Sequence, residues 1–238
     1  MSKTITITGG SSDIGLAMAK RIASEGDRLL LHYNSRKPSL ARSEFKCCDI
    51  ELVCSDFSNQ ESLSRFCKEI EKTDVLINNA AVVKTDVLPF LQDEIIERMI
   101  SVNVTALIKI CRAVLPYMSS KRKGVLLNIS SVAAHRGNRG QTVYAGTKGF
   151  MESFSRSLAA EFGAKGIRVN CIAPGPVESA SLKEIMSYAP DQVKDSVLSK
   201  RLGKPEDIAE LAAFLCSDAS EFINGQTVGI DGGFIRGL

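Results

Sequence analysis

The sequence has few of the residues that build metal sites. Its 238 residues include only two histidines, His32 and His135, and neither has a cysteine nearby at the spacing of zinc ligands. Apart from the adjacent Cys47 and Cys48, the seven cysteines are scattered along the chain. An odd number of scattered cysteines is typical of free thiols in a reducing compartment. We therefore expect no metal site and a cytoplasmic protein.

Strong charge and long apolar runs are also missing. The net charge is +3 with neutral histidines, which is too small to indicate a nucleic-acid or membrane partner. The first residues, MSKTITITGG, enter a strand pattern at once, without the basic region and cleavage site of a signal peptide. No run of about 18 apolar residues is present, so we expect no membrane span.

Strand and helix patterns alternate along the chain. Short apolar strands are predicted at residues 4–7, 29–31, 74–78, 125–129, 168–172 and 226–230. Amphipathic helices are predicted at residues 14–24, 60–71, 93–119, 144–163 and 205–216. The alternation predicts an α/β, Rossmann-type doubly wound fold, with a mostly parallel sheet and helices on both faces. No linker or repeat divides the chain, so we expect one domain over 1–238, with 179–200 as a mobile substrate lid.

A glycine-rich turn, TGGSSDIG at residues 8–15, joins the first strand to the first helix. Gly9, Gly10 and Gly15 would let the backbone approach a phosphate at the helix N-terminus. The spacing is TGxxxxxG rather than GxGxxG, and a plain turn explains it equally well. We expect Asp13 to cap free N–H groups in the first helical turn, with its carboxylate facing away from a bound phosphate.

The end of the second strand bears on the choice of cofactor. An acid at this place binds the ribose 2′-hydroxyl of NAD, whereas a base accommodates the 2′-phosphate of NADP. The sequence here is Tyr33-Asn34-Ser35-Arg36, without an acid. Arg36 could equally be a solvated surface residue. Its position relative to the glycine turn favours NADP(H), with NAD(H) as the alternative.

Tyr144 and Lys148 stand four positions apart in a helix pattern and therefore share a face. A lysine ammonium beside a phenol lowers the phenol pKa and makes it a general acid or base. A half-buried tyrosine near a surface lysine is the alternative. Ser131 follows the strand at 125–129, where its hydroxyl could polarise a carbonyl. Asn103 carries a small cost inside a helix, which suggests a polar task.

Together these motifs resemble the short-chain dehydrogenase/reductase family over essentially the whole chain. The matching residues are Thr8-Gly9…Gly15, Asn78-Asn79-Ala80, Asn103, Ser131, Tyr144-x-x-x-Lys148 and Pro174-Gly175. The resemblance implies a Rossmann-type fold and hydride transfer between a nicotinamide and a carbonyl or alcohol. Tyr144 would donate the proton in reduction, Lys148 would lower its pKa and hold the nicotinamide ribose, Ser131 would polarise the carbonyl, and Asn103 would support a water that links Lys148 to solvent.

The resemblance also implies a set of cofactor-binding residues. The backbone near Val177 would hold the carboxamide, and Asp56 would face the adenine. The full set is Gly9, Ser11, Ser12, Ile14, Gly15, Asn34, Ser35, Arg36, Asp56, Phe57, Asn79, Ala80, Tyr144, Lys148, Pro174, Gly175, Val177 and Ser179.

Within the family, the second half of the chain looks like beta-ketoacyl-acyl-carrier-protein reductases, which implies a small-molecule or acyl-thioester substrate presented by an acidic carrier protein. Candidate docking residues beside the active-site mouth are Lys121, Arg122, Lys123 and Lys165, although each alone fits a solvated loop. Ser12 replaces an arginine that these reductases often carry. The helices at 93–119 and 144–163 resemble those that pair subunits in this family, so we expect a homotetramer.

The sequence leaves the substrate open. Residues 82–84, 133–136 and the lid at 179–200 would select it, but their mixed character names none, and the short segment 38–56 matches no interpretable pattern. We expect NADPH-dependent reduction of a beta-ketoacyl thioester in fatty acid synthesis. One alternative is an NAD(P)-dependent dehydrogenase of a sugar, steroid or other secondary alcohol. Another is a catalytically silent dinucleotide sensor or scaffold, against which the intact Asn103, Ser131, Tyr144 and Lys148 set argues.

Overall fold

The computed structural model describes residues 2–40, 45, 49–179 and 194–235. Most of the expected lid at 179–200 therefore lies outside the described residues, as do Cys47 and Cys48.

Seven parallel strands form one sheet in the order β3-β2-β1-β4-β5-β6-β7. Their bounds are β1 Thr4–Thr8, β2 Arg28–Tyr33, β3 Asp49–Cys54, β4 Val75–Asn78, β5 Gly124–Ile129, β6 Ile167–Pro174 and β7 Thr227–Ile230. The order reverses between β1 and β4, and a ligand is expected at such a switch point, outside the carboxyl ends of the strands. The predicted Rossmann-type doubly wound sheet is confirmed.

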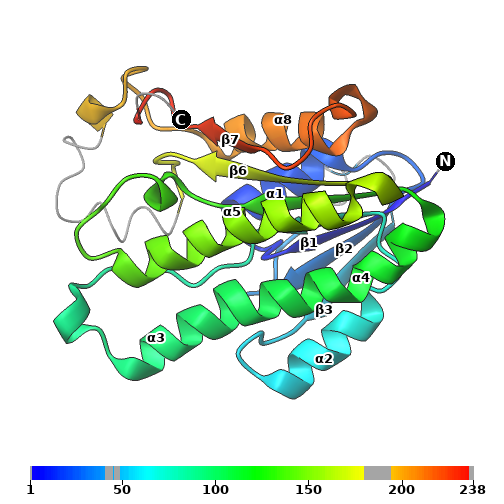
Figure 1. The fold of residues 1–238 in the computed structure, drawn as a ribbon, viewed down its shortest axis with the longest axis horizontal. Helices are drawn as coiled ribbons and strands as arrows, with labels where there is room; N and C mark the ends of the chain where they lie inside the picture. Colours follow the sequence, from blue (N-terminus) through cyan, green and yellow to red (C-terminus); the bar gives the residue numbers. More distant parts are fainter. Residues whose placement is uncertain (1, 41–44, 46–48, 180–193, 236–238) are drawn as a thin grey trace.

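Helices cover both faces of the sheet (Figure 1). The main helices are α1 Asp13–Ile22, α2 Gln60–Glu69, α3 Asp93–Ile100, α4 Leu107–Lys121, α5 Thr142–Phe162 and α8 Pro205–Cys216. Helices α1 and α8 pack in one buried core, and α2, α4 and α5 pack in the other. Short helical turns are η2 Leu88–Phe90, η3 Ser101–Ala106, η4 Val132–Ala134, η5 Gly163–Lys165 and η6 Asp218–Ser220.

Strand β3 is an element that the sequence patterns did not predict. It pairs with β2 at the edge of the sheet, and Arg28 on β2 forms a 2.6 Å ion pair (Nη2–Oε2) with Glu51 on β3. Only Val53 is fully buried, because an edge strand has a neighbour on one side alone. The charged Asp49 and Glu51 interrupt the apolar run that marks the central strands, so the pattern was missed.

The helices α3, η3 and α4 run on continuously from Asp93 to Lys121, as Figure 1 shows. An 18-residue window in this stretch has a mean hydropathy of 1.5, so length and composition alone would permit a membrane span. The stretch is not an uninterrupted apolar run, because it includes Asn103, Lys109 and Arg112. Part of the window, 44%, is buried inside the protein, and its apolar side chains pack on the sheet. The hydropathy of this stretch therefore has an explanation within the core.

Candidate active site

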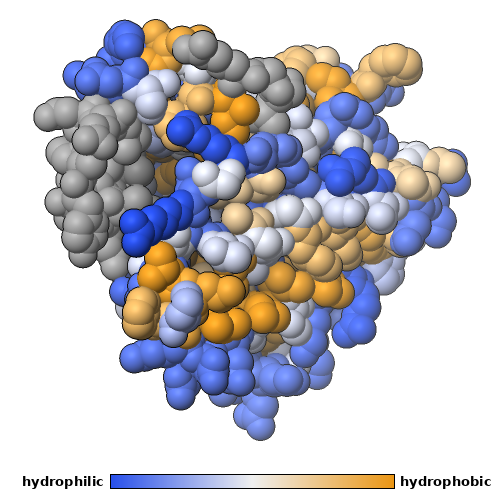
Figure 2. Space-filling view, turned by 60° about the vertical axis from the view of Figure 1, so that its left-hand side comes forward, coloured by the Kyte–Doolittle hydropathy of each residue, from blue (hydrophilic) through white to orange (hydrophobic). Residues whose placement is uncertain are grey.

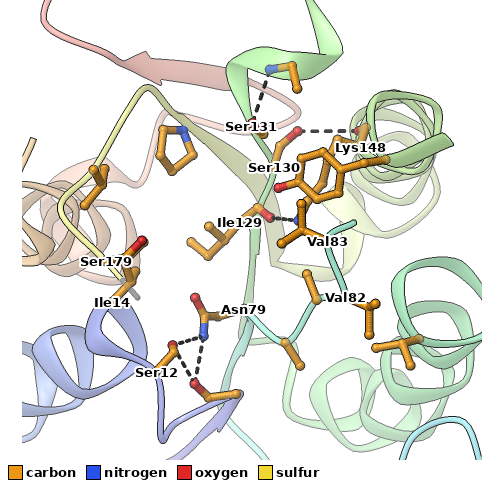
Figure 3. Close-up of a pocket in the computed structure, with 18 of the residues that line it drawn as sticks. Ser12, Ile14, Asn79, Val82, Val83, Ile129, Ser130, Ser131, Lys148 and Ser179 are labelled. Carbon is orange, nitrogen blue, oxygen red and sulfur yellow. Dashed lines mark hydrogen bonds between the residues drawn. The ribbon is translucent and has the colours of Figure 1, made fainter. Parts of the chain in front are cut away.

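A cavity of about 940 Å³ lies at the carboxyl ends of the central strands, at the predicted switch point. Figure 3 shows the glycine-turn residues Ser12 and Ile14 on one side of it and Ser131 and Lys148 on the other. Most of the predicted site residues line it: Gly9, Ser11, Ser12, Ile14, Asn34, Arg36, Asp56, Phe57, Asn79, Ala80, Ser131, Tyr144, Lys148, Pro174, Gly175, Val177 and Ser179. The fold thus brings residues from nearly the whole chain to one place.

Three predicted site residues, Gly15, Ser35 and Asn103, do not line this cavity. Gly15 lies beneath the turn, where a Cβ would clash with the carbonyl oxygen of Gly9. Gly9 itself has a φ of +63°, and a Cβ there would lie 2.9 Å from the Cα of Ala80. Both glycines are therefore required by close backbone approach, which is what a phosphate cradle needs.

Side chains from outside the glycine turn hold its shape. Asn79, just after β4, donates from Nδ2 to the carbonyl oxygen of Gly9 (2.9 Å) and to Ser12 Oγ (3.1 Å). Ser12 caps α1, because its Oγ accepts the N–H of Gly15 at 3.1 Å. Ser12 therefore caps one of the free N–H groups of the first turn, and the capping role expected for Asp13 stays a prediction. Asp13 is the first residue of α1 and lines the cavity, and the expectation that its carboxylate faces away from a bound phosphate stays a prediction.

His32, near the end of β2, is a site residue that sequence reasoning missed. Its Nδ1 accepts the N–H of Gly9 at 3.0 Å, and its Nε2 lies 2.8 Å from the carbonyl oxygen of Ser55. The ring stacks on Phe57 with 3.9 Å between centroids. Burial lowers the pKa of His32 to about 4, so the ring is neutral, with its proton on Nε2. A histidine in an otherwise apolar buried strand was the available signal.

Polar groups gather where an adenosine would lie. Asp56 accepts from the N–H of Ser58 (2.9 Å) and its Oγ–H (2.6 Å), and these bonds, helped by Arg98, lower the pKa of Asp56. Arg36 lines the same end of the cavity beside Asn34. Arg98, on α3, is a second cationic lining residue that the sequence reasoning did not identify. This end of the cavity therefore offers two guanidinium groups and one carboxylate.

Lys148 and Tyr144 meet Ser131 at the other end of the cavity. Lys148 is buried and donates from Nζ to the carbonyl oxygen of Ile129 at 2.6 Å (Figure 3). Its Nζ lies 5.7 Å from the centroid of the Tyr144 ring. Ser131 Oγ accepts the N–H of Ala133 at 3.1 Å.

The pKa values at this end differ from the expectation. Burial raises the pKa of Tyr144 to about 12, and the neighbouring Ser131 hydroxyl only partly opposes it. Burial also lowers the pKa of Lys148 to about 8. The predicted lowering of the phenol pKa by Lys148 is therefore wrong for this state, because desolvation of the phenolate dominates and Lys148 points at a backbone carbonyl. Tyr144 is held as a phenol, which is the form that donates a proton.

Asn103 lies outside the cavity and binds the backbone of a segment that lines it. It lies in η3, a π-helical turn, and its Oδ1 accepts the N–H of Val82 at 2.8 Å. Its Nδ2 donates to the carbonyl oxygen of Val82 (2.8 Å) and to Thr147 Oγ1 (3.2 Å). Asn103 therefore ties the segment after β4 to α5, next to Tyr144. A π-helical turn inside an α-helix often marks a functional position. The expected water link stays a prediction.

The proposed docking cations are far from the cavity. Lys121, Arg122 and Lys123 precede β5 at its amino end, and Lys165 follows α5 at the amino end of β6. Because all strands are parallel, these residues lie at the amino-terminal ends of the strands, whereas Ser131 lies at the carboxyl-terminal ends. Lys121 is also paired with Asp74, with 2.6 Å between Nζ and Oδ1. The expectation that they flank the active-site mouth of their own chain is therefore wrong.

The residues expected to select the substrate lie only partly in the cavity, whose lining includes polar side chains such as Asn138 and Gln141 as well as apolar ones. Of the residues expected to select the substrate, Val82, Val83 and Ala133 line it, whereas 84 and 134–136 do not. Arg139 and Phe234 also line it, and the Phe234 ring lies 4.5 Å from the guanidinium of Arg136. Neither Arg139 nor Phe234 was predicted, since no sequence pattern connects these loops. Across the described part of the chain, no group of three or more possible ligands for a metal is found.

Known proteins resemble this chain over almost its whole length. A family model described as enoyl-(acyl carrier protein) reductase matches residues 9–235. The 3-oxoacyl-[acyl-carrier-protein] reductase FabG of Chlamydia trachomatis is 34% identical, over 98% of this chain and 97% of that protein. FabG of Thermotoga maritima is 32% identical, over 98% of each chain. A crystal structure assigned as an NAD(P) dependent gluconate 5-dehydrogenase from Beutenbergia cavernae, with NADP bound at low occupancy, is similar with a TM-score of 0.89 and 25% identity, over 99% of this chain and 97% of that one.

Proposed function

The chain belongs to the short-chain dehydrogenase/reductase family and is an NAD(P)-dependent oxidoreductase, and we propose that it uses NADPH to reduce the keto group of a beta-ketoacyl thioester. The observation that carries the proposal is one cavity in which the glycine turn, Arg36 and the Ser131–Tyr144–Lys148 group all meet.

The described residues fit a nicotinamide dinucleotide. The backbone of the glycine turn packs too closely for a Cβ at Gly9 or Gly15, and the N-terminus of α1 follows directly, beside Ser11, Ser12 and Ile14 of the cavity lining. Phe57 and Asp56 would border the adenine, and Val177 would hold the carboxamide end. Such a cofactor, when bound, supplies the hydride.

The protein's own groups would supply the proton and the orientation. Tyr144, held as a phenol, donates the proton to the developing alkoxide. Ser131 donates a hydrogen bond to the same oxygen. Lys148 contributes a buried positive charge beside both, anchored on the carbonyl oxygen of Ile129.

Arg36 supports the preference for NADPH. It lines the adenosine end of the cavity, and the residues after β2 include no acid that would bind a free 2′-hydroxyl. A guanidinium binds a phosphate through two parallel N–H bonds. The bound NADP of the gluconate dehydrogenase structure shows that a related cavity accepts this cofactor.

Two substrate classes compete. The two FabG relatives favour a beta-ketoacyl thioester, and Val82, Val83 and Ala133 offer apolar walls for an acyl chain. A carrier protein would then present the substrate. The structural similarity to the gluconate dehydrogenase favours a sugar acid instead, for which Arg139 offers a positive charge.

Initial-rate kinetics separate these proposals. We expect oxidation of NADPH with acetoacetyl thioesters and a much lower kcat/KM with NADH. Turnover with a keto sugar acid but with no thioester would exclude the reductase and favour the second class. No turnover with either, together with an unchanged cellular phenotype of Tyr144→Phe, would indicate a silent sensor or scaffold.

We also propose that one catalytic domain spans 1–238, with residues 179–200 as its lid, and that it works as a cytoplasmic homotetramer. Large apolar side chains are exposed along η2, α3 and α4, including Leu88, Phe90, Ile100 and Ile108. Figure 2 shows apolar side chains gathered in a broad area on the face in view. Burying such an area in a symmetric interface would stabilise the assembly. A light-scattering mass near the 25.7 kDa of one chain would contradict it.

A further inference from the structure

A buried carboxylate lies one helical turn beyond Lys148 on α5. This residue, Glu152, is 4% exposed and belongs to none of the motifs described above. Its Oε1 accepts a hydrogen bond from Ser130 Oγ at 2.7 Å, and both of its carboxylate oxygens lie 2.9 Å from His135 Nε2. An ionised carboxylate is costly to bury without such partners. Two polar groups on a separate segment thus satisfy it.

The partners of Glu152 lie on both sides of Ser131. Ser130 precedes Ser131 directly, and His135 closes the short helical turn η4 that Ser131 begins. Glu152 therefore fixes both ends of this segment to the helix that carries Tyr144 and Lys148. Figure 3 shows how closely the two elements approach, with Ser130 Oγ 3.4 Å from the carbonyl oxygen of Lys148. The separation of Ser131 from Tyr144 depends on this attachment.

The charge of Glu152 also acts on Lys148. The ionisable groups around Glu152 are His135 from η4, Lys148 from its own helix and Cys171 from β6. Glu152 stands four residues after Lys148 on α5, so these two buried side chains share a face of the helix. Burial lowers the pKa of Lys148, and the neighbouring Cys171 and Glu152 both oppose that effect. Cys171 is buried and its thiol pKa is raised to about 11, so it is neutral in the range where Lys148 titrates. Glu152 is thus the carboxylate that keeps a buried ammonium charged.

We propose that Glu152 is a positioning residue of the active site: through Ser130 and His135 it fixes the segment of Ser131 against α5, and through its charge it keeps Lys148 protonated. The inference rests on the proposed function, in which Lys148 must be an ammonium to hold the cofactor ribose and support Tyr144.

Glu152→Gln tests the effect of the charge. The amide is nearly isosteric and can still accept from Ser130, so the fold is retained. Without the negative charge, Lys148 loses its proton at lower pH. We expect the basic limbs of kcat/KM and of NADPH affinity to move down by about one pH unit, which is a loss of about threefold midway between the two midpoints and of about tenfold above both. Glu161→Gln removes an exposed carboxylate from the same helix and should leave both profiles unchanged.

Glu152→Asp tests the attachment separately. It keeps the charge but shortens the side chain, so it cannot hold Ser130 and His135 together. We expect kcat to fall at least several-fold while the basic limb stays in place. This variant also keeps the proposal testable if Glu152→Gln is unstable.

NADPH binding, followed by fluorescence, needs no carbonyl substrate. It therefore tests the proposed function separately from the proposed role of Glu152. Wild-type protein that binds no NADPH would contradict the proposed function itself. Wild-type protein that binds NADPH, with a basic limb that Glu152→Gln leaves unmoved, would overturn the role of the Glu152 charge alone. A Glu152→Asp variant with lower thermal stability but unchanged kcat would show that the attachment is merely structural.

Discussion

The two ends of the cavity are held in different ways. At the cofactor end, neutral groups hold the glycine turn: the N–H of Gly9 is bound by His32 and its carbonyl oxygen by Asn79. At the catalytic end, the buried Lys148 and Glu152 are both ionisable and lie on one helix. A backbone cradle needs fixed shape, whereas proton transfer needs groups whose charge the protein controls. Near neutral pH, the cofactor end should therefore depend on its geometry and the catalytic end on the ionisation of its side chains.

Removing the phenol of Tyr144 should impair catalysis while leaving cofactor binding intact. Because Tyr144 is the proton donor of the proposal, Tyr144→Phe should lower kcat by about 10²–10⁴-fold. NADPH affinity, measured by fluorescence titration, should change little, since the phenol contributes little to the cradle around Gly9. Loss of NADPH binding to the same extent as kcat would show that the two ends are not independent.

Acid should destabilise the folded protein through His32, which holds the glycine turn at the cofactor end. Its folded pKa is about 4, below the usual value of 6.5, so the unfolded chain binds more protons between these two pH values. Stability is therefore lost as pH falls from about 6.5 to about 4, by about 3 kcal/mol at most from this group. Urea unfolding across this range measures the loss.

A His32→Gln variant supplies the control for that prediction. It lacks the titrating ring, so the part of the acid dependence that arises from His32 should disappear, even if the variant is less stable at pH 7. An acid slope identical to that of the wild type would assign the loss to other groups.

Arg36 tests whether any part of the cofactor end depends on charge. If its guanidinium binds the 2′-phosphate, Arg36→Ala should raise the KM for NADPH by about 10–100-fold, the worth of a charge-assisted hydrogen bond. The KM for NADH should stay nearly constant, because NADH lacks that phosphate. Equal effects on both cofactors would instead point to general weakening of this end, with Arg98 as the next candidate.

The sequence predicted the central strands because buried parallel strands are continuous apolar runs. It failed at β3, where one-sided pairing permits Asp49 and Glu51 within a strand. At the site, local motifs predicted Gly9, Ser131, Tyr144 and Lys148. His32 and Glu152 hold these groups in place. Both are buried and contact residues that are distant in the sequence, so no local pattern reveals their role. The pKa of Tyr144 was misjudged for the same reason, since desolvation depends on the surrounding fold.

The smallest effect of a substitution is expected at Asp13, which is an ionisable residue beside the glycine turn. As the first residue of α1 it complements the helix dipole, but Ser12 already caps the N–H of Gly15. Asp13→Gly should therefore lower the free energy of unfolding by only about 0.5–1 kcal/mol, through the lost charge and the added backbone freedom. If the carboxylate does not face the phosphates, the KM for NADPH stays nearly unchanged. Because Asp13 lines the cavity, a marked fall in that KM would show that its charge repels the cofactor, and the cofactor end would then also be tuned by an ionised group.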